Sequence, residues 1–246
     1  IYKDGFSGAV TGLTLAGLDL RYNDDSPIIS KSVDVDLINT FEFNTFDDIL
    51  RSYERQYKCI ITDDTGFQYI EGYLVTDVAE KQFQKNSRIT LTFTDYLKRL
   101  TQIEPDTVLN TLGSRVKLIN IINDCLAQTG IEDSLYVNNK LYHSGNTMTT
   151  AYTLFDQIYV DTDLFWKNNE EKENSYDILK ILLKSFNCYI YHYDSNWCIE
   201  RYDDIIDDIN NWTRYLFGSD TGYGISNLFQ SQTKQSEDYH YTNRSA

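Results

Sequence analysis

The sequence predicts a strand-rich α+β fold. A small β-barrel-like domain is expected over residues 1–104, and a mixed α/β region over 105–246. Two observations lead to this prediction. Short segments that alternate apolar and polar residues, separated by close turns, fill the first hundred residues. Further on, a stretch with helical spacing runs without a linker into alternating residues, so that an amphipathic helix and a hairpin lead into a second β-module. We expect that module to continue beyond the end of the chain.

The predicted barrel-like domain contains several short strands and one helix. Its strands are expected in VTGLTLAGLDLRY (two, around Ala16 and Gly17), in SVDVDLI (32–38), in the hairpin KCIITDDTGFQYIEGYLV (58–75, turning at Asp63 to Gly66) and in RITLTFT (88–94). The helix is expected to begin at Thr45, with Asp48 in a capping position. Many short strands with close turns are typical of a small barrel or sandwich.

The segment TQIEPDT, residues 101–107, is the predicted domain boundary. A helix is expected after it, from about Arg115 to Thr129, with Gly130 as its C-terminal stop. The segments YIEGY (69–73) and CIERY (198–202) each follow a turn that contains Asp, which hints at a duplicated β-module.

Residues 175–204 predict a helix followed directly by a hairpin. Ser175 is the expected N-cap and Asn187 the expected left-handed stop, and the apolar helix face comprises Ile178, Leu179, Leu182, Leu183 and Phe186. We expect Leu182, Phe186 and Trp197 to pack together between the helix and the hairpin. Tyr189, Tyr191 and Tyr193 share one strand face. The sequence leaves open whether that face belongs to the chain's own core or to a subunit contact.

The composition excludes some classes of function. The chain has 246 residues, 41% of them hydrophobic, which is enough for substantial cores. Its formal net charge of −15 opposes binding to a phosphate backbone. No segment is apolar for long enough to span a bilayer. Because the first residue is Ile1 rather than Met, we expect a segment of a longer chain.

The four cysteines do not have zinc-ligand spacing, and three scattered histidines do not supply it. A turn at Ser195 and Asn196 would set Cys188 and Cys198 five positions apart along the hairpin. That offset is about 16 Å, too far for a disulfide. We therefore expect free thiols and assembly in a reducing cytoplasm.

No catalytic, cofactor-binding or metal-binding residue is predicted. The segment GFSGA (5–9) lacks the last glycine of a nucleophile elbow, and GYGISN (222–227) lacks the context of a dinucleotide site. DTDLFWKNNE, from Asp161, has Phe165 and Trp166 where a calcium loop needs a ligand and a glycine. Adjacent acidic residues are usually solvated turns, and here they are Asp24–Asp25, Asp47–Asp48, Asp63–Asp64, Asp203–Asp204 and Asp207–Asp208. The last two pairs are a minor candidate for calcium.

The order of motifs resembles tail proteins encoded by phages and prophages of gut bacteria and, more distantly, the baseplate or tail-tip hub family. The resemblance runs from about Gly5 to Tyr202, through GFSGAVTGLTLAGLDLRY, SPIISKSVDVDLI, YIEGYLV, ITLTFTDYLKRL and SYDILKILLKSFNCYIYHYDSNWCIERY. The sequence departs from the pattern at Tyr96 and Asn196, where glycines would be expected.

The resemblance implies a non-enzymatic structural component of the virion tail, assembled in the bacterial host cytoplasm. Such subunits form a ring, typically a trimer, and contact the tail tube and the tail-tip or spike proteins. Two alternatives stay open at this stage. One is a tail-associated cell-wall hydrolase, which would need two facing carboxylates with a raised pKa. The other is a carbohydrate-binding adhesion module, which would need a groove lined by Tyr and Trp.

Overall fold

The computed structural model describes residues 10–16, 26–38, 52–76, 80–81, 88–105, 109–138, 153–168, 170–201, 212–216 and 226–232. Two larger sheets and one two-stranded ribbon are built from these residues. The first sheet has the order β1 (Val10–Ala16), β3 (Ser32–Ile38), β7 (Arg88–Thr94), β5 (Gln68–Leu74) and β4 (Lys58–Thr62), with β6 (Glu80–Lys81) beside β7. The predicted strands 32–38 and 88–94 and the predicted hairpin are therefore confirmed.

Alternation explains the pairing of β3 with β7. Val33 lies opposite Phe93 and Val35 opposite Leu91, and all four side chains are buried in one apolar cluster. On the other face, Thr90 Oγ1 donates to Asp36 at 2.7 Å and Thr92 Oγ1 donates to Asp34 at 2.6 Å. The register is thus fixed on one face by burial and on the other by cross-strand hydrogen bonds.

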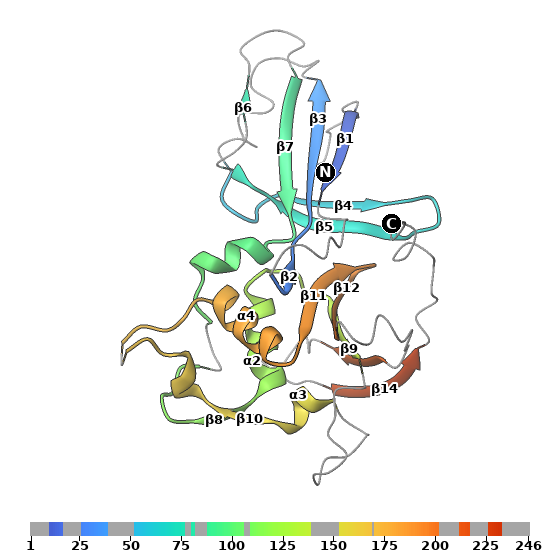
Figure 1. The fold of residues 1–246 in the computed structure, drawn as a ribbon. Helices are drawn as coiled ribbons and strands as arrows, with labels where there is room; N and C mark the ends of the chain where they lie inside the picture. The colour runs from blue at the N-terminus through green and yellow to red at the C-terminus, as the bar shows by residue number, and fades with distance from the viewer. Residues whose placement is uncertain are drawn as a thin grey trace, which may run out of the picture.

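The predicted barrel is not confirmed, because the first sheet does not close among the described residues. β5 pairs with β7 only through Tyr73 and Leu74, and the β4–β5 hairpin then crosses the long strands, as Figure 1 shows. Gly72 permits this crossing, since a Cβ there would lie 2.5 Å from the carbonyl oxygen of Thr94. No pairing joins β1 to β4 in the described residues. The strand direction of the first sheet therefore changes between β7 and β5, but the described strands do not close into a barrel.

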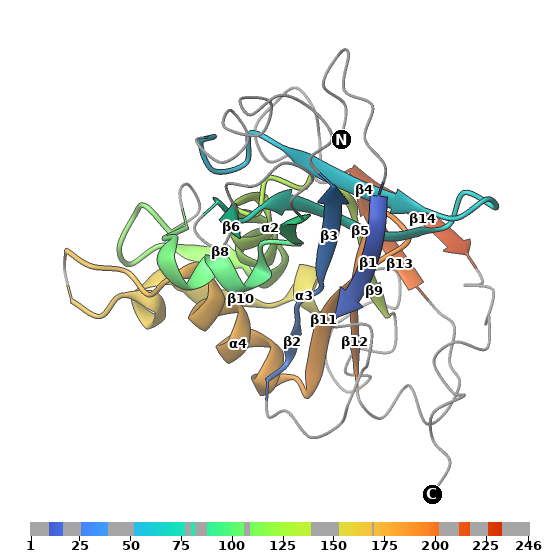
Figure 2. The ribbon, with the colours of Figure 1, turned by 90° about the horizontal axis from the view of Figure 1, so that it is seen from above.

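The second sheet has the order β14 (Ser226–Gln232), β13 (Trp212–Leu216), β9 (Ser134–Asn138), β12 (Asn196–Arg201), β11 (Cys188–Tyr193) and β2 (Ile28–Ile29). Figure 2 shows α4 (Ser175–Ser185) to one side of β2 and β11, with β9 and β13 further along the sheet. β2 comes from the N-terminal part of the chain and pairs in parallel with β11. The boundary predicted near residue 104 stays a prediction, and backbone hydrogen bonds cross it.

Helix α2 (Leu118–Ala127) is the central helix of the larger core. It is buried on nearly all sides: the buried positions are Leu118, Ile119, Ile121, Ile122, Asn123, Asp124, Cys125 and Leu126. The predicted start at Arg115 is wrong, because residues 115–117 form β8 (Arg115–Lys117), which pairs with β10 (Tyr159–Asp161). The predicted stop is confirmed, since Gly130 has φ of 77°.

The start of α4 also differs from the prediction by one residue. Asn174, not Ser175, is the N-cap, and its side chain accepts a hydrogen bond from the backbone N–H of Asp177 at 2.8 Å. Ser175 is buried as the first helical residue. Asn and Ser are equally good caps, so the sequence alone did not distinguish two neighbouring candidates. The predicted left-handed stop at Asn187 is confirmed by its φ of 53°.

The hairpin register differs from the prediction too. Asp194 and Ser195 form the turn, with φ of 44° and 59°, and Tyr193 pairs with Asn196. Cys198 therefore lies opposite Tyr191, and Cys188 lies opposite Arg201. The two cysteines are three positions apart instead of five, an offset of about 10 Å that still exceeds the reach of a disulfide. Two left-handed residues in succession give the turn whose twist matches that of the strands.

The remaining short elements are 3₁₀ turns Leu97–Gln102 and Thr162–Phe165 and helix α3 (Leu154–Gln157). In the described part of the chain, helices are too short or too polar to cross a membrane. Several predictions fall outside the described residues: the helix from Thr45, the strand after Gly17, the segment 5–9, all but the last two residues of the segment 222–227, and every acidic pair except Asp63–Asp64.

Candidate functional site

A buried carboxylate, Asp95, lies where β7 ends and the second sheet begins. It accepts hydrogen bonds from Ser30 Oγ at 2.6 Å, from the backbone N–H of Lys31 at 2.7 Å and from that of Leu97 at 3.1 Å. Burial raises the pKa of Asp95, and these hydrogen bonds act in the opposite direction. Both carboxylate oxygens are already occupied. Asp95 therefore ties the segment between β2 and β3 to the end of β7, which is a structural role.

A second buried polar pair joins β11 to the segment before β9. His192 is fully buried, and its Nε2 lies 2.6 Å from Asp133 Oδ2. Its ring meets Trp197 edge-on, with centroids 4.8 Å apart. The Nδ1 atom has no hydrogen-bond partner among the described residues. Sequence reasoning missed this pair because the two residues are 59 positions apart, and only the parallel pairing of β9 with β12 brings them together.

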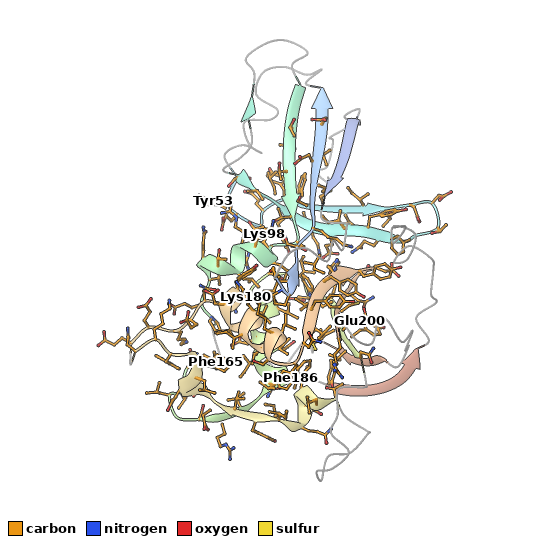
Figure 3. The ribbon with its side chains drawn as sticks, in the orientation of Figure 1. Tyr53, Lys98, Phe165, Lys180, Phe186 and Glu200 are labelled. Carbon is orange, nitrogen blue, oxygen red and sulfur yellow. The ribbon has the colours of Figure 1, made fainter. Side chains whose placement is uncertain are left out.

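The tyrosine face of β11 lies in the interior of the chain. Tyr189 and Tyr191 are each 2% exposed, and their rings stack with centroids 5.5 Å apart. Both hydroxyls donate to Glu200 Oε2, at 2.6 and 3.2 Å. Burial raises the pKa of Tyr191 well above its usual value. Figure 3 shows Glu200 and Lys180 on opposite sides of β11, so this face points away from α4. Of the two roles left open by the sequence, the core role fits these two residues.

The opposite face of the hairpin carries the packing predicted between helix and strand. Leu182 and Trp197 are buried in the core cluster that includes α2. Phe186 is half-buried at the edge of that cluster, and its ring contacts Phe155 edge-on with centroids 5.3 Å apart. Phe186 is the C-cap residue of α4, which explains its partial exposure.

Among the described residues, the acidic residues singled out in the sequence do not form a catalytic or metal-binding group. Asp63 Oδ1 accepts from the backbone N–H groups of Thr65 and Phe67, both at 2.9 Å, and so closes its own turn. Asp161 pairs with Arg115, and Asp163 accepts from the backbone of Gly113. No group of three or more potential metal ligands lies among the described residues. Nor do the described acidic residues include two facing carboxylates whose pKa values are raised.

A further candidate surface is the outer edge of β4. Cys59 is buried there, whereas Lys58, Ile60 and Thr62 are exposed, with Ile60 at 52%. Lys58 forms an ion pair with the buried Glu71 on β5. A strand at the rim of a sheet offers backbone hydrogen-bonding groups to another chain, so this edge is a candidate contact surface and not a reaction centre.

Comparison with known proteins finds likeness among solved structures. No protein-family model matches the chain, and no curated protein matches it. A solved structure described as prophage MuSo2, 43 kDa tail protein from Shewanella oneidensis is 17% identical with a TM-score of 0.38. The match covers 70% of this chain and 47% of that one, so the chain spans about half of its length. At this TM-score the likeness supports no conclusion about fold or function.

Proposed function

We propose that this protein is a structural component of a phage tail, of the baseplate or tail-tip hub class found in phages and prophages of gut bacteria. The observation that carries the proposal is the order of motifs from Gly5 to Tyr202. The solved structure reported above is itself a prophage tail protein, but its likeness adds no weight. The protein acts by self-association, in a ring that is expected to be trimeric, and by contacts with tail tube and tail-tip or spike proteins. It works in the virion tail after assembly in the host cytoplasm.

The contacts of the described ionisable groups and the net charge of the chain are compatible with this structural role. The ionisable groups Asp95, His192 and Glu200, of which the first two are fully buried, hold elements of the chain together through hydrogen bonds within it. The net charge of −15 suits a surface that does not retain an anionic polymer such as DNA. No specific observation favours the hydrolase or the carbohydrate-binding alternative.

The proposal is tested in a lysogen that carries the gene. Deletion should give particles with absent or incomplete tails in electron micrographs, and expression of the intact gene in trans should restore them. Antibody labelling of restored particles should mark the tail tip. Complete, infectious tails after deletion would refute the proposal.

The proposal also implies that the purified chain does not hydrolyse peptidoglycan. Saturable turnover that disappears on substitution of one carboxylate would contradict this part and would favour the hydrolase alternative.

A further inference from the structure

In the described part of the chain, the outer edge of β4 has a regular set of backbone hydrogen-bonding groups that no strand occupies. The backbone N–H of Leu74 donates to Tyr57, so residues 57, 59 and 61 face β5, and residues 58 and 60 face outward. The register shifts after Ile61, and the backbone N–H of Asp63 donates to Phe67, so Thr62 also faces outward. The extra residue of this bulge lies on β5, which leaves the alternation of β4 undisturbed. Among the described residues no strand pairs with this edge.

This edge lacks most of the features that usually prevent strands from pairing between molecules. Such features are proline, a bulge on the edge strand, a very short strand, inward-pointing charge and charged edge side chains such as lysine. Only the last is present, in Lys58, whose charge is paired with Glu71 of the same chain. β4 has five residues and contains no proline, and its central outward residue is the exposed Ile60. The other end strands of the two larger sheets among the described residues are β2, with two residues, and β1 and β14, with seven each.

The residues of β4 are complementary to themselves in the antiparallel direction. Pairing centred on Ile60 places Ile60 opposite its own copy and Lys58 opposite Thr62 of the second copy. Lys58 then approaches the turn of that copy, which carries Asp63 and Asp64. The pairing therefore contains an apolar pair at its centre and opposite charges at its ends, and no like charges face each other.

We propose that two copies of this chain associate through antiparallel pairing of their β4 edges, around a twofold axis at Ile60. The pairing would join the two first sheets into one continuous sheet. A twofold contact of this kind closes at two copies, whereas a ring requires a different, head-to-tail contact. The inference therefore goes beyond the proposed function. The twofold pairing and the proposed ring can be tested separately. A ring could form while the β4 edges stay unpaired, and two copies could pair through β4 without forming a ring.

The first test is the mass of the full chain in solution, measured by sedimentation equilibrium over a range of concentrations. Ile60→Pro removes the central outward N–H without removing a bond to β5, so this variant should lose the twofold association. The control is Leu164→Lys, which changes an exposed apolar residue elsewhere on the surface. Proline is avoided at this position because Leu164 lies in a 3₁₀ turn. Leu164→Lys should associate like the parent, and circular dichroism should be the same for all three proteins.

A second measurement keeps the inference testable if Ile60→Pro fails to fold. The native cysteines at 59, 125, 188 and 198 are all buried, so Ile60→Cys introduces an accessible thiol. A short bis-maleimide should link two Ile60→Cys chains rapidly, because directly opposed residues are only about 5.5 Å apart in such a pair. Leu164→Cys should react with the reagent but should not form linked pairs.

Each outcome decides the inference. Concentration-dependent pairs of 28.7 kDa chains that are lost in Ile60→Pro and trapped by Ile60→Cys support it. A monomeric parent, or association and cross-linking that do not depend on residue 60, overturns it. A head-to-tail ring that persists in Ile60→Pro while the twofold pairs are lost supports the inference, because the two contacts are separate. A different tail protein cross-linked at residue 60 in place of a second copy overturns it and leaves the tail-hub proposal intact.

Discussion

Tyr96 adopts a left-handed backbone conformation, with φ of 65°, at the position where the resembled pattern has glycine. Its ring is fully buried, meets Tyr73 edge-on at 5.7 Å and lies 5.2 Å below the guanidinium of Arg55. Burial and the cation–π contact thus oppose the steric cost of the left-handed conformation. In the hairpin turn, Asp194 and Ser195 take the left-handed positions, so Asn196 does not need to be glycine.

Tyr96→Gly is expected to lower the stability of the protein although it removes the backbone strain. The strain is worth about 1–2 kcal/mol, whereas emptying a buried aromatic site costs about 3–5 kcal/mol. We therefore expect a net loss of about 2–3 kcal/mol, measured by urea denaturation. Tyr96→Phe is the matched control, because the buried hydroxyl has no hydrogen-bond partner among the described residues. A Tyr96→Gly variant as stable as the parent would show that the ring contributes little.

Asp63 is expected to stabilise the β4–β5 hairpin only when it is ionised. The hydroxyl of Thr65, followed by the backbone of Phe67 and of Thr65 and the hydroxyl of Tyr69, holds the pKa of Asp63 below its usual value. A carboxyl whose pKa is lower in the folded state stabilises the fold above the unfolded pKa of about 3.9 and loses this effect as the pH falls through the folded pKa. Asp63→Ala should therefore lower the urea midpoint at neutral pH, with a difference that shrinks in acid. Asp64→Ala serves as the control, and an equal difference at every pH would contradict the explanation.

At the scale of elements, the hairpin of β11 and β12 is buried on both faces. Trp197 and Ile190 face the helices, while Tyr189, Tyr191 and Cys198 form a smaller cluster on the other side. A strand buried on both faces does not show the polar alternation of a half-exposed strand. This is why the sequence pattern located the hairpin but left the role of its tyrosine face open.

Tyr191→Ser is expected to lower the melting temperature of the isolated chain, because Tyr191 is a core residue. The loss should be about 3 kcal/mol, typical of removing a buried aromatic ring. Tyr191→Phe keeps the ring and loses only the hydrogen bond to Glu200, so it should cost about 1 kcal/mol. If Tyr191→Ser melts like the parent, the tyrosine face does not contribute to the folded core.

The cysteines of the hairpin are expected to be reduced and separate. All four cysteines are buried thiols, and Cys188 and Cys198 lie in different pairs of the hairpin register. Alkylation without reductant should therefore add four labels per chain in denaturant and proceed slowly in the native state. Two missing labels at Cys188 and Cys198 would contradict this prediction.

At the scale of the whole molecule, the N-terminal and C-terminal parts of the chain both contribute to the second sheet and to the larger core. β2 contributes to the second sheet, Leu97 and Leu100 enter the larger core, and Asp95 accepts a hydrogen bond from the segment after β2. Further contacts join the turn of the β4–β5 hairpin to the turn of the β11–β12 hairpin. The backbone N–H of Gln68 donates to Asp194 at 3.2 Å, and the rings of Phe67 and Tyr193 meet with centroids 5.2 Å apart.

The charge of the whole molecule is expected to weaken self-association at low salt. Two copies that each carry −15 repel one another, and added salt screens this repulsion over a Debye length that falls from about 30 Å at 0.01 M to about 8 Å at physiological ionic strength. The association constant measured by sedimentation should therefore rise between these two conditions. A fall with added salt would show that attraction between opposite charges, such as Lys58 and the acidic turn, dominates instead.

The sequence by itself determined the elements whose signals are local. Alternation located β3, β4, β5 and β7, helical spacing located α2 and α4, and left-handed residues such as Asn187 and Gly130 marked where the helices end. These signals come from side-chain periodicity and backbone sterics, which act within a few residues. The same locality explains the errors at Ser175, Arg115 and the hairpin turn, where neighbouring residues are almost equally suitable.

Only the tertiary structure decided which distant residues meet. It placed β2 beside β11, joined His192 to Asp133, and left β4 at the edge of a sheet instead of inside the predicted barrel. Strand order depends on the free energy of burying whole faces and pairing backbone groups across the chain, to which each residue contributes little. The sequence could therefore indicate that Ile60 belongs to a strand, but only the arrangement of the sheets showed that this strand is an edge among the described residues.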